Sequence, residues 1–282
     1  MEIKQILQNL ILKNDIDYLG ISSLQRFKNA PEGHRPTDLL PSAKSVIVLG
    51  LKIPLGAIRG NDLAYRGIRH AIFSYVDFGY NRINEQLDFS ALAVVRYIER
   101  NYHHIAYAVP AGWPRDEYLL MGAMSNRYAA VCAGLGEFGW SGLVLTSQDG
   151  PRVRFVSIIT EMEIEPDPLY NGPKLCQGCK KCVDICPVGA LARDECVEVK
   201  INKCLSAYSL RNKPLCRSAT AGLVRGTPGR LQADIPYSIK TMEEYYELSK
   251  KDDPWHRMEL SRGNYCHRCM TVCPVGKGEH YA

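Results

Sequence analysis

Two cysteine-rich segments constrain this chain more than any other feature. The first runs from Cys176 to Pro187 and reads C-x2-C-x2-C-x3-C-P, and the second runs from Cys266 to Pro274 and reads C-x2-C-x3-C-P. Three thiolates two residues apart on a tight turn can reach three irons of one cubane cluster, whereas the fourth faces a second cluster. Proline after that cysteine ends the ligand loop because its ring fixes φ. The spacing therefore predicts [4Fe–4S] clusters.

The alternatives are a zinc site and a disulfide framework. Structural zinc usually takes two pairs of ligands separated by a spacer, whereas this spacing is typical of bacterial ferredoxins. Seven of the 11 cysteines lie in the two segments, and the first 15 residues form an amphipathic helix pattern without features of an export signal. We therefore expect a reducing cytoplasm. An anaerobic or low-oxygen setting is also expected, because exposed cubanes react with oxygen.

The crossover of the fourth cysteine divides the ligands between two clusters. The first cluster takes Cys176, Cys179, Cys182 and Cys273. The second takes Cys186, Cys266 and Cys269 and needs one more ligand, for which the candidates are Cys196, Cys204 and Cys216. We prefer Cys204, because it follows an expected β-ribbon at 197–201 that should return the chain toward the cluster. Cys196 is then expected in the hairpin turn, and Cys132 and Cys216 are expected as buried free thiols.

The composition is that of a globular protein with one large or two smaller domains. The chain has 282 residues, 46% of them hydrophobic, and its net charge of +5 is not gathered in a basic run. That charge gives no argument for a nucleic acid partner. The most apolar stretch, 46–58, is interrupted by Lys52 and Pro54, so no membrane span is expected.

Strands alternating with helices predict an α/β domain at 1–168, followed by a ferredoxin-like domain at 169–282. The clearest predicted elements of the first domain are a helix at 2–13, a buried strand at 45–51, a helix at 82–100 and a helix at 117–132. Strands at 143–146 and 153–160 are expected to pair with each other. The second domain carries an insertion at about 205–262, helical at 240–252, that forms either a lid or a structural cap.

A glycine-rich stretch, Gly134-Leu-Gly136-Glu-Phe-Gly139, matches the G-x-G-x-x-G pattern. A dinucleotide site needs a strand before this pattern and a helix after it. Here a helical segment precedes it and a strand follows, so a Rossmann site is not expected. Glycines at the end of a helix still permit close approach to a flat cofactor, and a simple tight turn is the alternative.

Three stretches resemble the superfamily of epoxyqueuosine reductases and reductive dehalogenases. They are Gly33-His-Arg-Pro-Thr-Asp-Leu-Leu-Pro-Ser-Ala-Lys-Ser-Val-Ile-Val-Leu-Gly, Ala133-Gly-Leu-Gly-Glu-Phe-Gly-Trp-Ser-Gly-Leu-Val-Leu, and the cysteine segments with Lys203-Cys204-Leu-Ser between them. The resemblance covers nearly the whole chain. It implies an N-terminal domain like a flavin reductase or nitroreductase that binds base-off cobalamin, and a ferredoxin domain that passes single electrons to the cobalt. It also supports Cys204 as a ligand, and it places Gly134, Gly136, Gly139, Trp140 and Ser141 at the cofactor.

The chain departs from the epoxyqueuosine reductases in two ways. Their proton donor is the Asp of an Asp-Ser-x-Pro segment shortly before the glycine-rich turn, and the corresponding stretch here is Leu120-Met-Gly-Ala. Their C-terminal helical repeats, which help to hold transfer RNA, have no counterpart in these residues, so epoxyqueuosine is not expected as substrate. Reductive dehalogenases use a Tyr with a basic neighbour. This likeness makes Tyr118 and Arg127 catalytic candidates, and Asp116 is a third, because burial raises the pKa of a carboxyl group.

The features together predict an oxidoreductase: a cobalamin-dependent iron–sulfur reductase of a small organic substrate. Its electrons would come from a donor such as ferredoxin or flavodoxin. One alternative is an electron-transfer or corrinoid-reducing protein without substrate chemistry of its own. Another is a reductase that binds FMN, because the N-terminal fold class also hosts flavin.

Overall fold

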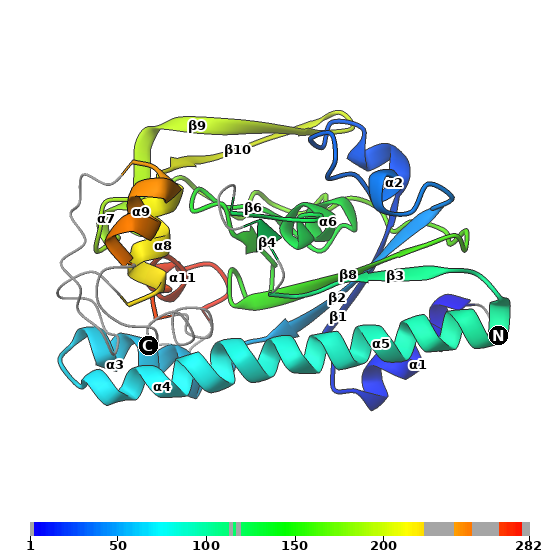
Figure 1. Ribbon diagram of the computed structural model, residues 1–282, viewed down its shortest axis with the longest axis horizontal. Helices are drawn as coiled ribbons and strands as arrows, with labels where there is room; N and C mark the ends of the chain where they lie inside the picture. Colours follow the sequence, from blue (N-terminus) through cyan, green and yellow to red (C-terminus); the bar gives the residue numbers. More distant parts are fainter. Residues whose placement is uncertain (1–2, 113–114, 117–119, 223–239, 250–264, 278–282) are drawn as a thin grey trace.

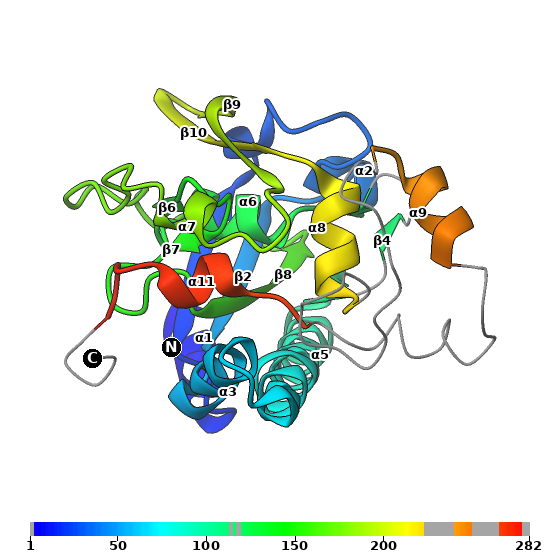
Figure 2. The ribbon, with the colours of Figure 1, turned by 90° about the vertical axis from the view of Figure 1, so that its left-hand side faces the viewer.

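The computed structural model describes residues 3–112, 115–116, 120–222, 240–249 and 265–277 (Figures 1 and 2). An antiparallel sheet with the strand order β1-β2-β8-β3 crosses the N-terminal part. Its strands are β1 (Tyr18–Ser23), β2 (Ser45–Lys52), β8 (Val153–Thr160) and β3 (Ala106–Val109). The protein is a mixed helix and strand structure, and β8, the last of these strands in sequence, lies between β2 and β3.

The central strand β2 is buried on both faces, as its unbroken apolar sequence predicts. Its side chains alternate between two cores because successive residues of a strand point to opposite faces. Val46 and Val48 pack in the core that contains the residues of α6 (Asn126–Cys132). Ile47 and Leu49 pack in the core that contains residues of α1 (Ile3–Lys13) and α5 (Arg82–Tyr102). The sheet therefore lies between two helical layers.

The helices α1 (Ile3–Lys13) and α5 (Arg82–Tyr102) cover one face of the sheet, and both confirm the amphipathic patterns in the sequence. Two other expectations are corrected. The helix expected at 117–132 is confined in the described residues to α6, which is preceded by a two-residue pair of β4 (Arg115–Asp116) and β5 (Met121–Gly122). The strand β7 (Val144–Leu145) pairs with β6 (Glu137–Phe138) instead of β8, because β8 forms its hydrogen bonds with β2 and β3.

A compact helical region connects β2 to α5. Its elements are α3 (Leu55–Tyr65), the 3₁₀ turn η2 (Arg69–Ala71), α4 (Ile72–Ser74) and the π-helical segment η3 (Tyr75–Asn81). Their apolar side chains share a core with Tyr265 and Met270 from the second cysteine segment. This region therefore joins the N-terminal half to the C-terminal cysteines. The short segments η1 (Leu24–Phe27) and α2 (Pro36–Leu39) lie beyond the other end of the sheet.

The C-terminal part consists of a long hairpin and several short helices. The hairpin pairs β9 (Leu191–Ile201) with β10 (Cys204–Arg211), and the helices are α7 (Lys181–Asp184), α8 (Lys213–Thr220), α9 (Met242–Ser249) and α11 (Arg268–Val272). In Figure 1 the hairpin runs along the top of the molecule from α8 to the region of α2. Its tip is fixed there, because Asn29 donates a hydrogen bond of 2.9 Å to the carbonyl of Lys200 and Ile201 is buried in the core beside α6.

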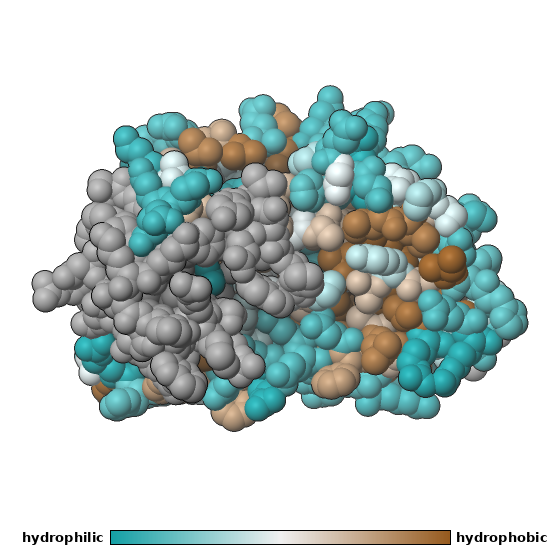
Figure 3. All heavy atoms as spheres, in the orientation of Figure 1, coloured by the Kyte–Doolittle hydropathy of each residue, from teal (hydrophilic) through white to brown (hydrophobic). Residues whose placement is uncertain are grey.

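The insertion expected at 205–262 contains α8 and α9, which pack against each other, and α9 confirms the helix expected at 240–252. It also contains most of β10, while residues 223–239 and 250–262 of the expected lid or cap lie outside the described residues. β3 is an edge strand of the sheet, and Ile105 and Tyr107 are exposed. Figure 3 shows hydrophobic residues gathered on the right-hand part of the face it draws. None of the described helices is long and apolar enough to cross a membrane.

Candidate iron–sulfur centres and the adjoining site

Four thiols from the two cysteine segments form a first group at the contact between α7 and α11. The members are Cys176, Cys179, Cys182 and Cys273. Burial, followed by the charges of Cys176, Cys273 and Cys179, raises the pKa of the Cys182 thiol to about 11. The structure therefore brings together the four cysteines that the spacing assigns to one cluster.

A second group contains Cys186, Cys266, Cys269 and Cys216. The thiols of Cys186, Cys216 and Cys266 pack against a small apolar core made by Val188, Ala190, Leu215, Ala219, Ala221 and Met242. Burial raises the pKa of Cys269, and the charges of Cys266, Cys216 and Cys186 raise it further. Three of these residues were expected at the second cluster. The fourth, Cys216, lies on α8 and was expected to be a free thiol.

The preferred fourth ligand, Cys204, is not near this group. The ribbon is longer than the sequence suggested, and its turn falls at 202–203, so Cys204 is an exposed residue opposite Ile201 at the tip. The group lies at the other end of the hairpin, where Arg211 pairs with Leu191. At about 3.3 Å per residue, β10 separates the two ends by roughly 23 Å. Cys196, expected in the turn, lies within β9 opposite Ser209. These placements correct the expected position of the hairpin turn, whereas Cys204 as a cluster ligand stays a prediction.

The geometry fits clusters better than single metal ions. Among the described residues, no three His, Cys, Asp or Glu side chains converge closely enough to hold one ion. A cubane holds its cysteine sulfurs further apart than a single ion does, because each sulfur binds a different iron. All eight grouped cysteines are free of disulfide bonds. Their loose grouping in fours is therefore suited to [4Fe–4S] clusters.

Backbone amides already point at a sulfur in each group. The amide of Trp140 donates to Sγ of Cys176 at 3.3 Å, and the amide of Ala190 donates to Sγ of Cys186 at 3.2 Å. Glu137 fixes the entry to the first cysteine segment, because its Oε1 accepts hydrogen bonds of 2.8 Å from the amides of Leu175 and Cys176. Hydrogen bonds to ligand sulfurs help to set a cluster's reduction potential.

The glycine-rich turn packs against the protein itself. Gly134 and Gly136 have φ values of 77° and 157°, and a Cβ on either would overlap a backbone carbonyl, that of Pro168 or Leu145. A Cβ on Gly139 would lie 3.0 Å from the side chain of Leu145. Internal packing therefore explains why glycine is needed at Gly134 and Gly136, whereas a Cβ on Gly139 would require only a shift of the Leu145 side chain. Contact between these glycines and a cofactor stays a prediction.

Trp140 and Ser141 lie between the two cysteine groups. Besides its amide bond to Cys176, Trp140 donates from its indole nitrogen to the carbonyl of Ala192 at 3.1 Å, and Lys180 lies over its ring. The carbonyl of the buried Ser141 accepts a hydrogen bond from Arg211 near the second group. The turn thus contacts the first group directly, and on its other side it contacts Arg211.

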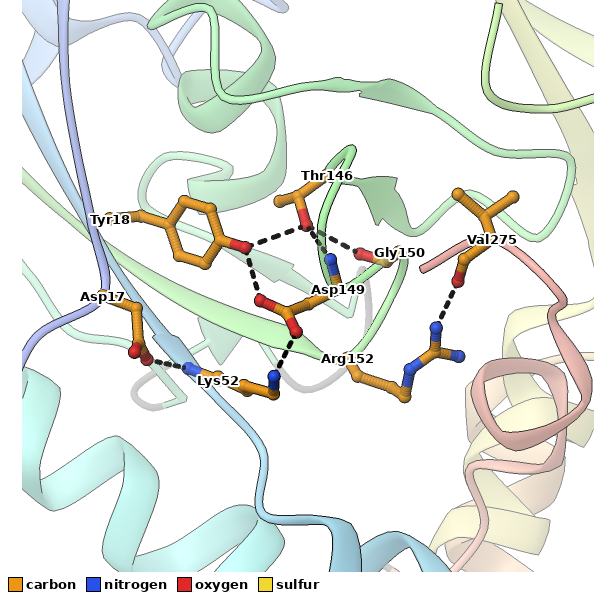
Figure 4. Close-up of polar contacts among 8 residues, drawn as sticks. All are labelled: Asp17, Tyr18, Lys52, Thr146, Asp149, Gly150, Arg152 and Val275. Carbon is orange, nitrogen blue, oxygen red and sulfur yellow. Dashed lines mark hydrogen bonds and ion pairs between the residues drawn. The ribbon is translucent and has the colours of Figure 1, made fainter. Parts of the chain in front are cut away.

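A buried arginine holds the chain that follows α11. The side chain of Arg152 is fully buried and donates to the carbonyls of Met270 (3.4 Å), Cys273 (3.1 Å) and Val275 (Figure 4). These contacts fix the position of Cys273 relative to the end of the sheet.

Asp149, three residues before Arg152, attaches the segment 146–152 to the sheet. This carboxylate accepts a hydrogen bond of 2.5 Å from the hydroxyl of Tyr18 and forms an ion pair of 2.5 Å with Lys52 (Figure 4). Burial, followed by the hydrogen bond to Asp149, raises the pKa of Tyr18 well above its ordinary value. The first cysteine group is therefore anchored through residues 146–152 to β1 and β2.

Two of the three catalytic candidates, Arg127 and Asp116, belong to described elements. Arg127, on α6, donates to the carbonyl of Gly142, and burial followed by the charge of Arg211 lowers the pKa of its guanidinium to about 10. Asp116 belongs to β4, and Tyr118 lies outside the described residues. Leu120, on the same segment, packs against the apolar core of the second group.

Several residues at these sites escaped the sequence analysis. Arg211, Glu137 and Arg152 belong to no motif, and their roles depend on contacts between distant segments. Cys216 carried a signal, since it was one of three candidates for the fourth ligand.

Comparisons with known proteins agree with this geometry. A family described as "4Fe-4S binding domain" matches residues 172–192. An epoxyqueuosine reductase of Bacillus cereus is 29% identical over 247 residues, which cover 86% of this chain and 51% of that protein. A tetrachloroethene reductive dehalogenase of Desulfitobacterium hafniense is 41% identical over 68 residues, 23% of this chain and 12% of that protein.

Solved structures show the same fold. Epoxyqueuosine reductase from Streptococcus thermophilus superposes with a TM-score of 0.53 at 18% identity, covering 99% of this chain and 67% of that one. A catabolic reductive dehalogenase superposes with a TM-score of 0.59 at 16% identity, and the match covers 94% of this chain and 35% of that one. The chain spans about half the length of the epoxyqueuosine reductases it matches in sequence. It is an iron–sulfur protein similar to the epoxyqueuosine reductases and the reductive dehalogenases.

Proposed function

We propose that this chain is an oxidoreductase in which two [4Fe–4S] clusters serve a corrinoid bound beside the second one. The observation that carries the proposal is the arrangement of eight cysteines in two groups of four, the first of them in contact with the Gly139–Gly142 turn. When bound, the clusters supply single electrons and the corrinoid supplies the centre at which a small organic substrate is reduced. A reductive dehalogenase whose structure suggests a mechanism for B12-dependent dehalogenation shares this fold, and this likeness supports a corrinoid over a flavin.

The chain's own residues would hold and orient these groups. Cys176, Cys179, Cys182 and Cys273 would hold the first cluster, and Cys186, Cys216, Cys266 and Cys269 the second. The amides of Trp140 and Ala190 would stabilise the charge on one ligand sulfur in each cluster. The N-terminal domain, which the resemblance likens to flavin reductases and nitroreductases, would supply the face on which the corrinoid lies.

The segment around β4 and β5 would supply the proton. Leu120 packs against the core of the second group, and Asp116 pairs in β4 with its neighbour Met121 in β5, which supports Asp116 as a candidate. Tyr118 is a candidate from the resemblance alone. Arg127 lies nearby on α6. The electron donor would be a small carrier such as ferredoxin or flavodoxin.

The test is cofactor binding after anaerobic purification and reconstitution with iron and sulfide. We expect about eight irons per chain, and a base-off cob(II)alamin signal by electron paramagnetic resonance when cobalamin is added. FMN, added separately, should not bind. Failure of cobalamin to bind would overturn the proposal. Cobalamin binding without turnover of any organic halide or epoxide would instead indicate an electron-transfer protein.

A further inference from the structure

The long helix α5 exposes apolar side chains on the side that does not face the sheet. Phe89 and Leu92, near the middle of the helix, are 70% and 49% exposed. A shallow groove of about 400 Å³ lies beside them, lined by these two residues, by Tyr97 and by Leu10 of α1. Figure 2, which views α5 almost along its axis, places the helix at the lower surface of the molecule. Large apolar side chains gathered on an exposed face indicate an interaction site.

Charged residues flank this apolar pair in a regular order. Six exposed residues recur every three or four positions and therefore lie along one face of α5: Arg82, Glu85, Phe89, Leu92, Arg96 and Glu99. From the start of the helix to its end, their side chains are basic, acidic, apolar, apolar, basic and acidic. In the opposite direction the order is acidic, basic, apolar, apolar, acidic and basic. The face is therefore complementary to a second copy of itself that runs antiparallel to it.

A twofold axis between positions 90 and 91 brings the complementary residues of two copies together. Phe89 of each chain then faces the partner's Leu92, and Glu85 faces the partner's Arg96. At a rise of about 1.5 Å per residue, Glu85 and Arg96 lie about 8 Å from the axis on either side. Their side chains can meet at that distance even when the helices cross at the shallow angle common for packed helices. The two outermost charges of the face meet in the same way, further from the axis.

The single chain already holds Glu85 in an ion pair. Arg82 and Glu85 approach to 2.7 Å, but their side chains stay 66% and 52% exposed. An ion pair this exposed contributes little to stability, because water solvates both groups and the long side chains lose conformational freedom. Glu85 can therefore bind the partner's Arg96, whether it keeps or releases Arg82.

We propose that two copies of this chain form a dimer in which their α5 helices pack antiparallel through Phe89 and Leu92, with Glu85 and Arg96 paired across the interface. Such an interface is isologous, because the same surface of both chains forms it. It is also small, since each chain contributes mainly one helix, so we expect a Kd in the micromolar range. The inference does not depend on the proposed function, because α5 covers a face of the sheet whose described core contains no cysteine.

The experiment is sedimentation equilibrium of the iron-loaded protein under anaerobic conditions, over a range of micromolar concentrations. We expect a reversible equilibrium between monomer and dimer. Phe89→Ser should raise the Kd of the dimer at least tenfold, because the twofold axis removes the apolar contact twice. The matched control is Leu205→Ser, which replaces a residue that is 63% exposed at the tip of the β9–β10 hairpin and should leave the Kd unchanged.

Charge reversal tests the antiparallel arrangement itself. Glu85→Arg and Arg96→Glu each place two like-charge pairs across the interface, so each variant alone should be monomeric where the unaltered chain is dimeric. The double variant restores both opposite-charge pairs and should dimerise again. A mixture of the two single variants should form a heterodimer, because one chain then offers two basic groups and the other two acidic groups. On one helix, positions 85 and 96 are roughly 16 Å apart, so no contact within a chain could produce this rescue.

Iron content and circular dichroism identify any variant that fails to fold, and the charge reversals test the interface even if Phe89→Ser disturbs the helix. The inference is overturned if the unaltered chain stays monomeric at every concentration, or if a folded Phe89→Ser protein dimerises as tightly as the unaltered chain. It is also overturned if Leu205→Ser weakens the dimer equally, or if neither the double variant nor the mixture of single variants recovers a dimer.

Discussion

Cys216 and Cys204 offer a direct test of how the second cluster is held. Cys216→Ser should lose about four irons of eight, because serine is a poor replacement for a thiolate ligand. Cys204→Ser should keep all eight, since Cys204 is exposed at the hairpin tip. Iron analysis and paramagnetic resonance measure both results.

Thiol labelling provides an independent check on the same assignment. Iodoacetamide should modify Cys204 and Cys196 in the iron-loaded protein and spare Cys216. Loss of iron from Cys204→Ser, together with full iron in Cys216→Ser, would show that Cys204 is the ligand.

Arg152 is expected to be the residue outside the cysteine segments on which the first cluster depends most. Arg152→Met leaves the carbonyls of Cys273 and Val275 without their donor, which should cost about 3 kcal/mol of unfolding free energy. Denaturant unfolding of the iron-loaded protein measures this loss. Arg82→Ala is the control, because its ion pair with Glu85 is on the surface and its removal should leave the midpoint nearly unchanged. A stable Arg152→Met protein with full iron would refute the anchoring role.

The grouping of ligand residues could be predicted from the sequence where it depends on the spacing within one motif. The grouping of Cys176, Cys179 and Cys182 with Cys273 follows from the motif alone, and the structure brings these thiols together. Cys216 could not be chosen from the sequence, because the choice depends on where the hairpin turns. The turn is fixed by contacts of Lys200 and Ile201 with the N-terminal half.

At the scale of elements, the turn between β7 and β8 and the chain after α11 approach each other through glycines. A Cβ on Gly150 would overlap the carbonyl of Val275, and one on Gly276 would overlap the backbone of Gly150. Gly150→Ala should therefore lower the unfolding free energy by about 3 kcal/mol.

A matched substitution separates this close contact from backbone strain. Gly33 also has positive φ, 79° against 56° for Gly150, but a Cβ there would meet nothing within 4 Å. Gly33→Ala should therefore cost only about 1 kcal/mol. Thermal unfolding measures both variants, and equal shifts in Tm would show that the contact with Val275 contributes nothing.

Elements were predictable in proportion to their length and periodicity. The helix α5 and strand β2 have patterns strong enough to be found from sequence. The pairing of β8 with β2 and β3 was missed, because a strand of the same composition could equally pair with its neighbour in sequence. The short strands β4, β5 and β6 have only two residues each, too few for any pattern to show, whereas β7 lies within the strand predicted at 143–146.

At the scale of the whole molecule, the N-terminal sheet and the second cysteine group have separate apolar cores. Removing iron with a chelator should therefore loosen α7, α8 and α11 and leave β1, β2 and β8 intact. Hydrogen exchange followed by mass spectrometry should show faster exchange in 176–190 and 265–273 and little change in the sheet. Uniform acceleration across the chain would show that the clusters support the whole fold.

The contact of Arg152 and Gly150 with the chain after α11 also sets an order of events during synthesis. On the ribosome, residues 149–152 emerge more than a hundred residues before Val275. Arg152 and Gly150 therefore cannot form their contacts with Val275 until the chain after α11 has been synthesised. Cys273, the last thiol of the first group, emerges just before that partner. Iron–sulfur assembly factors would therefore find a complete first site only when translation has passed these residues, and the nascent sheet must remain soluble until then.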